Sequence, residues 1–259
     1  MQNLKVTVIQ GDLAWQNVEK NLGSFDAKLA SLKETPDLVV LPEMFTTGFT
    51  MHPEACAETM EGAGVQYLLR WSRALGADVT GSIAVRDGGG YVNRLLWAKP
   101  DGTLLHCDKR HLFRMAGEEK VYRAGNSCLT VELKGWKLRP FICYDLRFPV
   151  WTRNRGSEYD AAVFVANWPE SRREHWRALL RARAIENQCY VIGVNRVGVD
   201  GNGVSYSGDS AVIDYNGTVL FENRGDECVR TEELSLKGLR DYRESFPAWK
   251  DADPFFLGH

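Results

Sequence analysis

The most informative stretch of the chain is Leu138-Arg139-Pro140-Phe141-Ile142-Cys143-Tyr144-Asp145-Leu146-Arg147-Phe148-Pro149, where an apolar strand gives way abruptly to charged and turn-forming residues. Cys143 stands at that boundary, at the end of a buried strand and the beginning of a loop. A thiol in mid-core is usually a small inert hydrophobe, whereas a thiol at the end of a strand can reach solvent and respond to neighbouring charges. The stretch therefore leaves two interpretations open, a core residue or a nucleophile.

Around this stretch the hydrophobic pattern alternates between strands and helices. Apolar runs predict strands at 4–9, 37–42, 78–83, 161–166 and 190–195, and helical periodicity predicts helices at 17–32, 65–75 and 173–187. Turn residues predict hairpins at Gly88-Gly89-Gly90, Pro100-Asp101-Gly102 and Lys134-Gly135, and a type I′ hairpin at Asn216-Gly217. This order indicates an α/β fold with a mixed sheet, or two sheets, and helices packed outside.

The chain shows no linker or low-complexity segment, so we expect a single domain over residues 1–259. The segment from Phe246 to His259 carries Phe255, Phe256 and Leu257 near its end. It is too apolar to remain free in solvent, and we expect it to dock on the core or on a partner subunit.

Composition excludes several classes of function. The chain has 259 residues, 44% of them hydrophobic and 25% charged, which suits one large core. A net charge of −2 and a pI near 6.2 provide no basic field for nucleic acid. The N-terminal residues start directly in a strand pattern, and no run approaches the roughly 18 apolar residues of a membrane span. We expect a cytoplasmic protein with neither nucleic acid nor membrane as a partner.

The cysteine pattern indicates reduced thiols. The six cysteines are scattered along a chain large enough to fold without disulfides, and none forms a CxxC pair. They are Cys56, Cys107, Cys128, Cys143, Cys189 and Cys228. The close Cys or His pairs typical of zinc sites are missing from the sequence, so we expect no metal.

Three predicted strands end at chemically reactive residues. The strand 38–41 is followed by Glu43, the strand 104–108 by Lys109 and the strand 138–142 by Cys143. The carboxyl ends of parallel strands meet at one edge of a sheet, where residues distant in sequence can converge.

Together these residue types suit acyl transfer. The Cys143 thiolate would attack a carbonyl and form a thioester, and Glu43 would move the protons. Lys109 and the backbone N–H of Tyr144 would stabilise the oxyanion. Each residue also has an ordinary structural interpretation: a solvated turn acid, a surface lysine and a core thiol. The residues by themselves favour those ordinary interpretations.

Three blocks carry a family resemblance. Leu41-Pro42-Glu43-Met44-Phe45, Asp108-Lys109-Arg110-His111-Leu112-Phe113 and Cys143-Tyr144-Asp145-Leu146-Arg147-Phe148-Pro149 resemble, in order, the signature blocks of the nitrilase (carbon-nitrogen hydrolase) superfamily. The similarity extends from Lys5 to beyond Tyr215. It implies an α-β-β-α four-layer sandwich, commonly dimeric, that needs no metal or organic cofactor.

The resemblance also implies roles for individual residues. Glu43 would be the general base, Lys109 would stabilise the tetrahedral intermediate and Cys143 would be the nucleophile. A second glutamate that holds the lysine or the substrate would be Glu118, with Glu119 the weaker candidate. A non-catalytic protein on this scaffold would be expected to lack one of the three principal residues, and this chain retains all of them.

Within the superfamily the chain looks most similar to the ω-amidase branch and its bacterial form. The similarity rests on residues 143–151, 165–169, 182–188 and 206–210, on 111–115, and on the ending 246–253. It implies hydrolysis of short 2-oxo acid monoamides, such as 2-oxoglutaramate and 2-oxosuccinamate, to a dicarboxylate and ammonia. The physiological role it implies is the removal of by-products of glutamine- or asparagine-dependent transamination. The alternative substrate is another small amide or an N-carbamoyl compound, since the pocket and not the triad selects the substrate.

Several residues are candidates for the substrate pocket. Phe45 and Trp168 could wall it, and Asn167 ends the strand that follows Cys143. Arg147 could pair with a substrate carboxylate, although a structural ion pair with Asp145 or another acid is the favoured interpretation. A Cys-His hydrolase that uses His111 or His175 is a poor second choice, because neither histidine lies in a motif typical of that chemistry.

Overall fold

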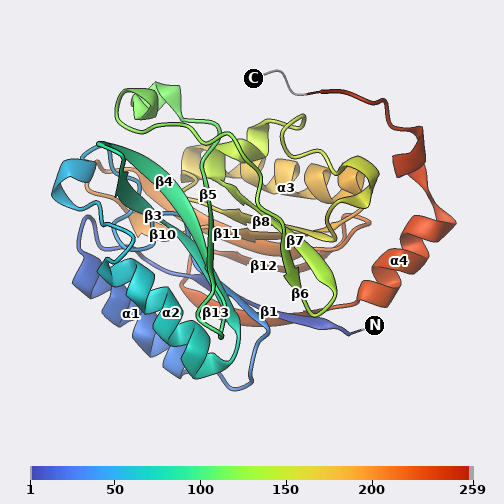
Figure 1. Cartoon of the computed structure of the whole chain (residues 1–259), viewed down its shortest axis with the longest axis horizontal. Helices are drawn as coiled ribbons and strands as arrows, with labels where there is room; N and C mark the ends of the chain where they lie inside the picture. The colour runs from blue at the N-terminus through green and yellow to red at the C-terminus, as the bar shows by residue number, and fades with distance from the viewer. Residues whose placement is uncertain (1, 257–259) are drawn as a thin grey trace.

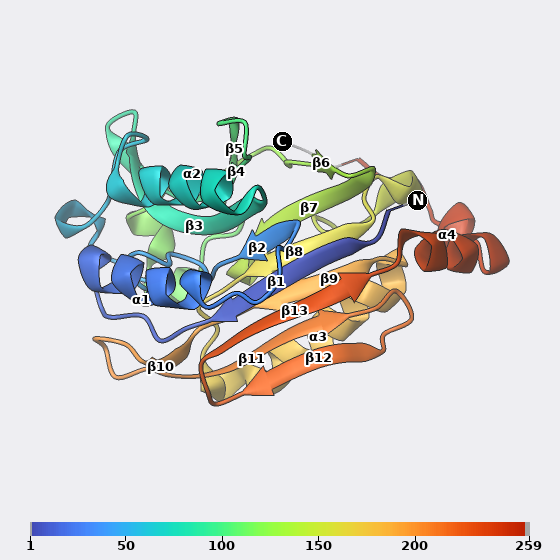
Figure 2. The same cartoon turned by 90° about the horizontal axis from the view of Figure 1, so that it is seen from below.

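The computed structural model describes residues 2–256 and contains two β-sheets that face each other, with helices on both outer sides (Figures 1 and 2). The resulting four layers confirm the α-β-β-α sandwich. The sequence pattern by itself left one sheet or two open.

The first sheet has the strand order β13-β1-β2-β3-β4-β5. Its strands are β1 (Leu4–Gln10), β2 (Leu38–Val40), β3 (Asp78–Asp87), β4 (Gly90–Ala98), β5 (Leu104–Asp108) and β13 (Cys228–Leu234). The strands β1, β2 and β3 are parallel, and β4 runs antiparallel between β3 and β5. Because β5 thus runs in the same direction as β2, Glu43 and Lys109 follow strand ends on the same edge of this sheet.

The second sheet has the order β10-β11-β9-β8-β7-β6, with β12 also paired to β11. Its strands are β6 (Val131–Leu133), β7 (Trp136–Ile142), β8 (Ala161–Val165), β9 (Tyr190–Val194), β10 (Val197–Val199), β11 (Ser205–Ile213) and β12 (Val219–Arg224). The strands β7, β8 and β9 are parallel. Cys143 and Asn167 therefore follow neighbouring strand ends of this second sheet.

Alternation along the strands buries both faces of the first sheet. In β2, Leu38 and Val40 belong to the core between the sheets, whereas Val39 packs on the outer side towards the helices. The helices α1 (Val18–Ala30) and α2 (Ala63–Leu75) cover that outer side (Figure 2). A strand buried on both faces needs apolar residues at successive positions, which explains the continuous Leu-Val-Val run.

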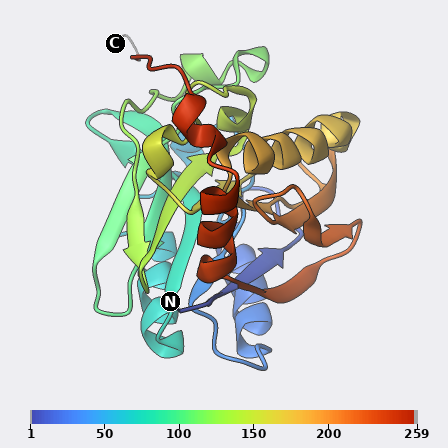
Figure 3. The same ribbon diagram turned by 90° about the vertical axis from the view of Figure 1, so that its right-hand side faces the viewer.

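The helix α3 (Arg173–Asn187) covers the second sheet, and α4 (Leu236–Ser245) lies at one end of the sandwich (Figure 3). The inward side of α3 carries Trp176, Leu180 and Ala184, as its periodicity predicted. No helix within residues 2–256 is long and apolar enough to cross a bilayer.

The turns follow the sequence with one exception. The three hairpins predicted at 88–90, 100–102 and 134–135 join β3 to β4, β4 to β5 and β6 to β7. The type I′ prediction for Asn216-Gly217 is wrong, because a type I′ turn needs positive φ at both central residues and only Gly217 has it, at 85°. The carboxylate of Asp214 accepts from the N–H groups of Asn216 and Thr218 and stabilises a longer turn instead.

The C-terminal segment is fixed at its start. The side chain of Gln188 donates to the carbonyl of Phe246 at 2.7 Å, and the Arg155 guanidinium lies 5.7 Å from the Phe255 ring centroid. The Phe256 side chain is 95% exposed, so this residue does not dock on the core of its own chain. Leu257 lies outside the described residues.

Candidate active site

Three charged side chains from the first sheet and its loops meet in one buried cluster. The ammonium of Lys109 donates to Glu43 Oε1 at 3.0 Å and to both carboxylate oxygens of Glu118, also at 3.0 Å. All three side chains are buried. Glu118 is therefore the second glutamate at the lysine, whereas Glu119 is exposed.

The carboxylates keep the lysine charged. Burial by itself lowers the pKa of Lys109, but the charges of Glu118 and Glu43 outweigh this effect and raise the pKa above the ordinary lysine value. Burial also raises the pKa of Glu118, and the charge of Lys109 opposes that rise. The surroundings of Lys109 thus favour its charged form.

Cys143 enters the site from the second sheet at the first position of the 3-10 helix η4 (Cys143–Arg147). Its φ of +46° is unusual for a residue with a side chain, and it turns the backbone sharply at the end of β7. The thiol is 8% exposed, and its Sγ lies 3.9 Å from the backbone oxygen of Asn167. Burial, followed by the charge of Glu43, raises the pKa of Cys143 well above its ordinary value, while Lys109 opposes the rise. The raised pKa favours the neutral thiol form of Cys143.

Asn167 joins the two sheets at the site. Its backbone N–H donates to Glu43 Oε2 at 2.8 Å, and its side-chain amide donates to the backbone oxygen of Glu43 at 2.6 Å. Asn93 in β4 donates to the other carboxylate oxygen of Glu43 at 2.8 Å. These bonds hold the Glu43 carboxylate in one orientation next to Lys109.

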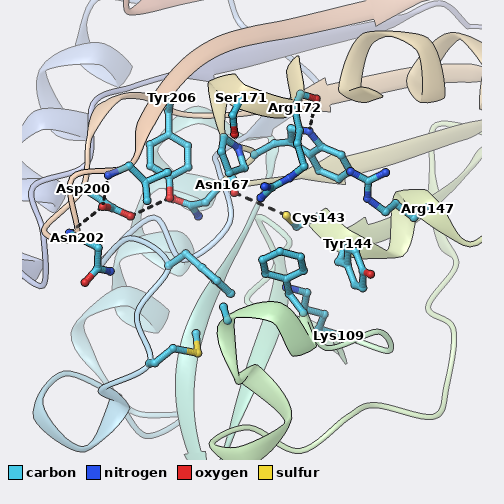
Figure 4. A pocket seen from close by; sticks show the side chains of 17 residues that line it. Lys109, Cys143, Tyr144, Arg147, Asn167, Ser171, Arg172, Asp200, Asn202 and Tyr206 are labelled. Atoms are coloured by element: carbon cyan, nitrogen blue, oxygen red, sulfur yellow. Dashed lines mark hydrogen bonds between the residues drawn. The ribbon is translucent and has the colours of Figure 1, made fainter. Parts of the chain in front are cut away.

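A cavity of about 270 Å³ opens over Cys143. Its lining includes Lys109, Cys143, Tyr144, Arg147 and Asn167 (Figure 4). Trp168 lines it as well. Tyr144 is the second residue of η4, so its N–H has no acceptor inside that short helix. The cavity thus brings a thiol and a cation together.

Phe45 does not line this cavity, contrary to the sequence prediction. The positive φ of Met44, 43°, reverses the chain after Glu43, and Ser82 of β3 accepts from the N–H groups of Met44 and Phe45. The Phe45 ring therefore points to the outer core, where its centroid lies 5.9 Å from that of Phe25. Phe49 lines the cavity instead, and its ring centroid lies 4.9 Å from Lys109 Nζ.

The predicted ion pair of Arg147 with Asp145 is also wrong. Asp145 accepts from the N–H of Ile142 at 3.1 Å, and from the N–H and Nδ1 of His111 at 2.9 Å and 2.8 Å. Arg147 instead donates to Nδ1 of His175 at 3.0 Å. Neither histidine lines the cavity within the described chain.

Some cavity residues escaped the sequence analysis. Met51, Asp200 and Tyr206 lie on loops or at a strand end, and Arg172 lies in a short 3-10 helix, so that their places at the cavity depend on the folded chain. Asn93, which contacts Glu43, carried a weaker signal, because it and Arg94 are polar residues within the largely apolar strand β4.

The geometry agrees with a comparison to known families. The model of the carbon-nitrogen hydrolase family matches residues 5–244. The chain belongs to this family. It is 48% identical over 258 residues to the omega-amidase YafV of Escherichia coli K12, covering 99% of this chain and 100% of that protein.

Two further similarities agree with the family. A 2-oxoglutaramate amidase of Bacillus subtilis is 32% identical over 250 residues, which covers 95% of this chain and 96% of the relative. The crystal structure of XC1258 from Xanthomonas campestris, a CN-hydrolase superfamily protein with an arsenic adduct in its active site, superimposes with a TM-score of 0.98 at 47% identity and full coverage of both chains. This chain is accordingly a carbon-nitrogen hydrolase with the sandwich fold of its relatives.

Proposed function

We propose that this enzyme is an ω-amidase that hydrolyses the terminal amide of short 2-oxo acid monoamides, 2-oxoglutaramate and 2-oxosuccinamate, to the dicarboxylate and ammonia. The observation that carries the proposal is the buried Glu43-Lys109-Glu118 cluster at a small cavity that also contains Cys143. Relatives named as omega-amidase and 2-oxoglutaramate amidase support the substrate class.

The first step transfers the Cys143 proton to Glu43 while sulfur attacks the amide carbon. Because the thiol is neutral at rest, proton transfer and attack have to be coupled. The resulting oxyanion would accept from Lys109 Nζ and the N–H of Tyr144. A preorganised donor of this kind is worth about 3 kcal/mol in the transition state.

Collapse of the tetrahedral intermediate breaks the C–N bond. Glu43 returns its proton to the departing nitrogen, so ammonia leaves and a thioester remains on Cys143. Glu43 then accepts a proton from water, whose oxygen attacks the thioester carbon. The C–S bond breaks, the carboxylic acid leaves, and Glu43 returns the proton to the sulfur to restore the free thiol. The orientation of Glu43 by Asn93, Asn167 and Lys109 suits one carboxylate acting in both half-reactions.

The cavity suits a small anionic amide. Its volume of about 270 Å³ limits the length of the substrate, and Trp168 and Phe49 provide aromatic walls. Arg147 lines the same space and, within residues 2–256, makes no ion pair with an acid. It is therefore available to pair with a substrate carboxylate.

Two experiments test the proposal. Cys143→Ala is expected to abolish ammonia release from 2-oxoglutaramate while the circular dichroism spectrum stays that of the parent, and unchanged turnover would refute it. A panel of 2-oxoglutaramate, 2-oxosuccinamate, a neutral aliphatic amide and an N-carbamoyl amine tests the substrate class. A clear preference for either of the last two compounds would replace ω-amidase by the alternative C–N hydrolase.

We also propose that the enzyme is a cytoplasmic homodimer in which residues 1–259 form one catalytic domain. The contiguous family match over 5–244 supports a single unit. Exposed apolar side chains, such as Ile185 of α3 and Phe256, support burial against a second copy.

A further inference from the structure

Two arginines face the cavity from one side of the site. Arg147 belongs to η4 and Arg172 to the short 3-10 helix η6 (Glu170–Arg172), and both line the cavity above Cys143 (Figure 4). Within residues 2–256, neither guanidinium forms an ion pair with a carboxylate. By contrast, Arg173, the next residue along the chain, pairs with Asp209 at 2.6 Å.

Aromatic rings hold the two guanidinium groups in place. The Arg147 guanidinium lies 4.7 Å from the ring centroid of Trp168, and that of Arg172 lies 5.3 Å from the ring centroid of Phe113. A cation–π contact uses the face of the ring and orients the cation, but it occupies none of the N–H donors of the guanidinium. Apart from the bond from Arg147 to His175, these donors remain available to a ligand.

The two charges are close enough to affect each other. The pKa of Arg147 is lowered mainly by burial, and the like charge of Arg172 lowers it further. Two cations side by side without a counter-ion repel each other, and a bound anion would relieve that repulsion.

Both carboxylate oxygens of Asp200, which lines the cavity, already accept hydrogen bonds from its own loop and from Tyr206. One oxygen of the Asp200 carboxylate accepts from the N–H groups of Asn202 and Val204 at 2.8 and 3.0 Å. The other accepts from the hydroxyl of Tyr206 at 2.9 Å. Asp200 thus shapes the loop before β11 and does not neutralise the arginines.

We propose that Arg147 and Arg172 form a two-guanidinium subsite for the carboxylate of the substrate, in which Arg172 determines specificity for anionic amides. The identity of the anion as a 2-oxo acid monoamide rests on the proposed function. The subsite favours a 2-oxo acid over the matching amino acid, because the ammonium group of an amino acid would approach two cations and find no free carboxylate.

The first test measures selectivity. For the parent, Arg172→Gln and Arg172→Lys, kcat/KM is determined with 2-oxoglutaramate, with L-glutamine and with the neutral amide butyramide. Arg172→Gln is expected to lower the ratio of 2-oxoglutaramate to butyramide by about tenfold to a hundredfold, the value of hydrogen bonds to a charged group. Arg172→Lys keeps the positive charge but loses the planar set of N–H donors. Its selectivity ratio should therefore lie between those of the parent and Arg172→Gln.

The matched control is Arg181→Gln, which removes one positive charge from the exposed surface of α3, away from the cavity. It should leave the selectivity ratio at the parent value. The proposal would be overturned if the selectivity ratio were the same in the parent and in Arg172→Gln. It would also be overturned if Arg181→Gln lowered that ratio as much as Arg172→Gln does.

The second test does not depend on turnover. Calorimetric titration of 2-oxoglutarate into Cys143→Ala, with and without Arg172→Gln, is expected to show affinity about tenfold to a hundredfold lower in the double variant. Equal affinities would overturn the subsite. If the double variant binds more weakly but the parent does not hydrolyse 2-oxoglutaramate, the subsite stands and the proposed function fails.

Discussion

At the level of single residues, Lys109 determines how the site can work. It lies between two buried carboxylates that raise its pKa and so favour its charged form. A lysine that stays protonated can stabilise an oxyanion but cannot accept the thiol proton. In the proposed mechanism the proton therefore moves between Cys143 and Glu43.

Glu118 should matter for catalysis, whereas Glu119 should not. Glu118→Gln removes a charge that holds Lys109 but keeps one hydrogen-bond acceptor, so we expect kcat to fall by about tenfold to a hundredfold, less than the complete loss of an oxyanion group. Glu119→Gln is the matched control, since that side chain is exposed one position away. Steady-state kinetics measures kcat for both variants. An equal fall in kcat for Glu118→Gln and Glu119→Gln would contradict the role assigned to Glu118.

The Cys143 thiol should make stability depend on pH. The pKa of Cys143 is raised in the folded protein. Below the pKa of the unfolded state, about 8.5, the thiol is protonated in both the folded and the unfolded state, so its full contribution to the free energy of unfolding is present. Above that pH the unfolded state releases the proton first, and the free energy of unfolding falls by up to about 1.4 kcal/mol per pH unit. Urea unfolding at pH 7, 9 and 10 should show a shallower fall for Cys143→Ala. Parallel curves would argue against a raised thiol pKa.

At the level of elements, η4 and the loop after β5 are held together through one carboxylate. Asp145 accepts from Ile142 before the nucleophile and from His111, two residues after Lys109. The His111 ring in turn stacks on Phe148 with centroids 3.7 Å apart. The hydrogen bonds of Asp145 thus stabilise the backbone turn at Cys143, where φ is positive, together with the loop that begins at Lys109.

Loss of the Asp145 carboxylate should therefore affect stability and catalysis together. Asp145→Ala leaves buried N–H donors without an acceptor, and we expect it to cost about 2–4 kcal/mol of unfolding free energy. It should also lower kcat, because Cys143 and Lys109 lose their shared support. The exposed acid Asp251 is the control, and Asp251→Ala should stay within about 0.5 kcal/mol of the parent in urea unfolding. A stable Asp145→Ala variant with parental kcat would contradict this role.

At the level of the whole molecule, the groups of the candidate active site come from both sheets. Glu43 and Lys109 follow strands of the first sheet, and Cys143 and Asn167 follow strands of the second. The site thus exists only where the two sheets pack face to face, with the bonds from Asn167 to Glu43 crossing between them.

The oligomeric state is testable on the intact chain. Light scattering coupled to size exclusion should give a mass near twice that of the 29.2 kDa chain, because the exposed apolar residues Ile185 and Phe256 favour burial against a second copy. A mass of one chain across micromolar concentrations would contradict the proposed homodimer.

The sequence could predict features that depend on local chemistry. The strand ends at Glu43, Lys109 and Cys143 follow from apolar runs that stop at polar or turn residues, and the hairpins follow from glycine-rich turns. Hydrophobic periodicity could not predict that these ends belong to two sheets, since it identifies a strand but not its partner. The two-sheet sandwich was expected from the family resemblance alone, and the structure confirms it. Phe45 was misplaced because a positive φ at Met44 reverses the chain, and no rule of alternation anticipates that reversal. Arg172 was missed because it lies on the short 3-10 helix η6, where an arginine carries no sequence signal that separates a cavity residue from a surface residue.

The pairing of β1 with β13 has a consequence for synthesis on the ribosome. The strand β1, Leu4–Gln10, meets its antiparallel partner, Cys228–Leu234, only after the strands β2 to β12 have been translated. Until then a nascent chain exposes one open, apolar strand edge, which is a template for unwanted pairing with other chains. Truncated translation products that end before Cys228 should therefore aggregate, whereas a chain that includes β13 covers this edge with its own strand.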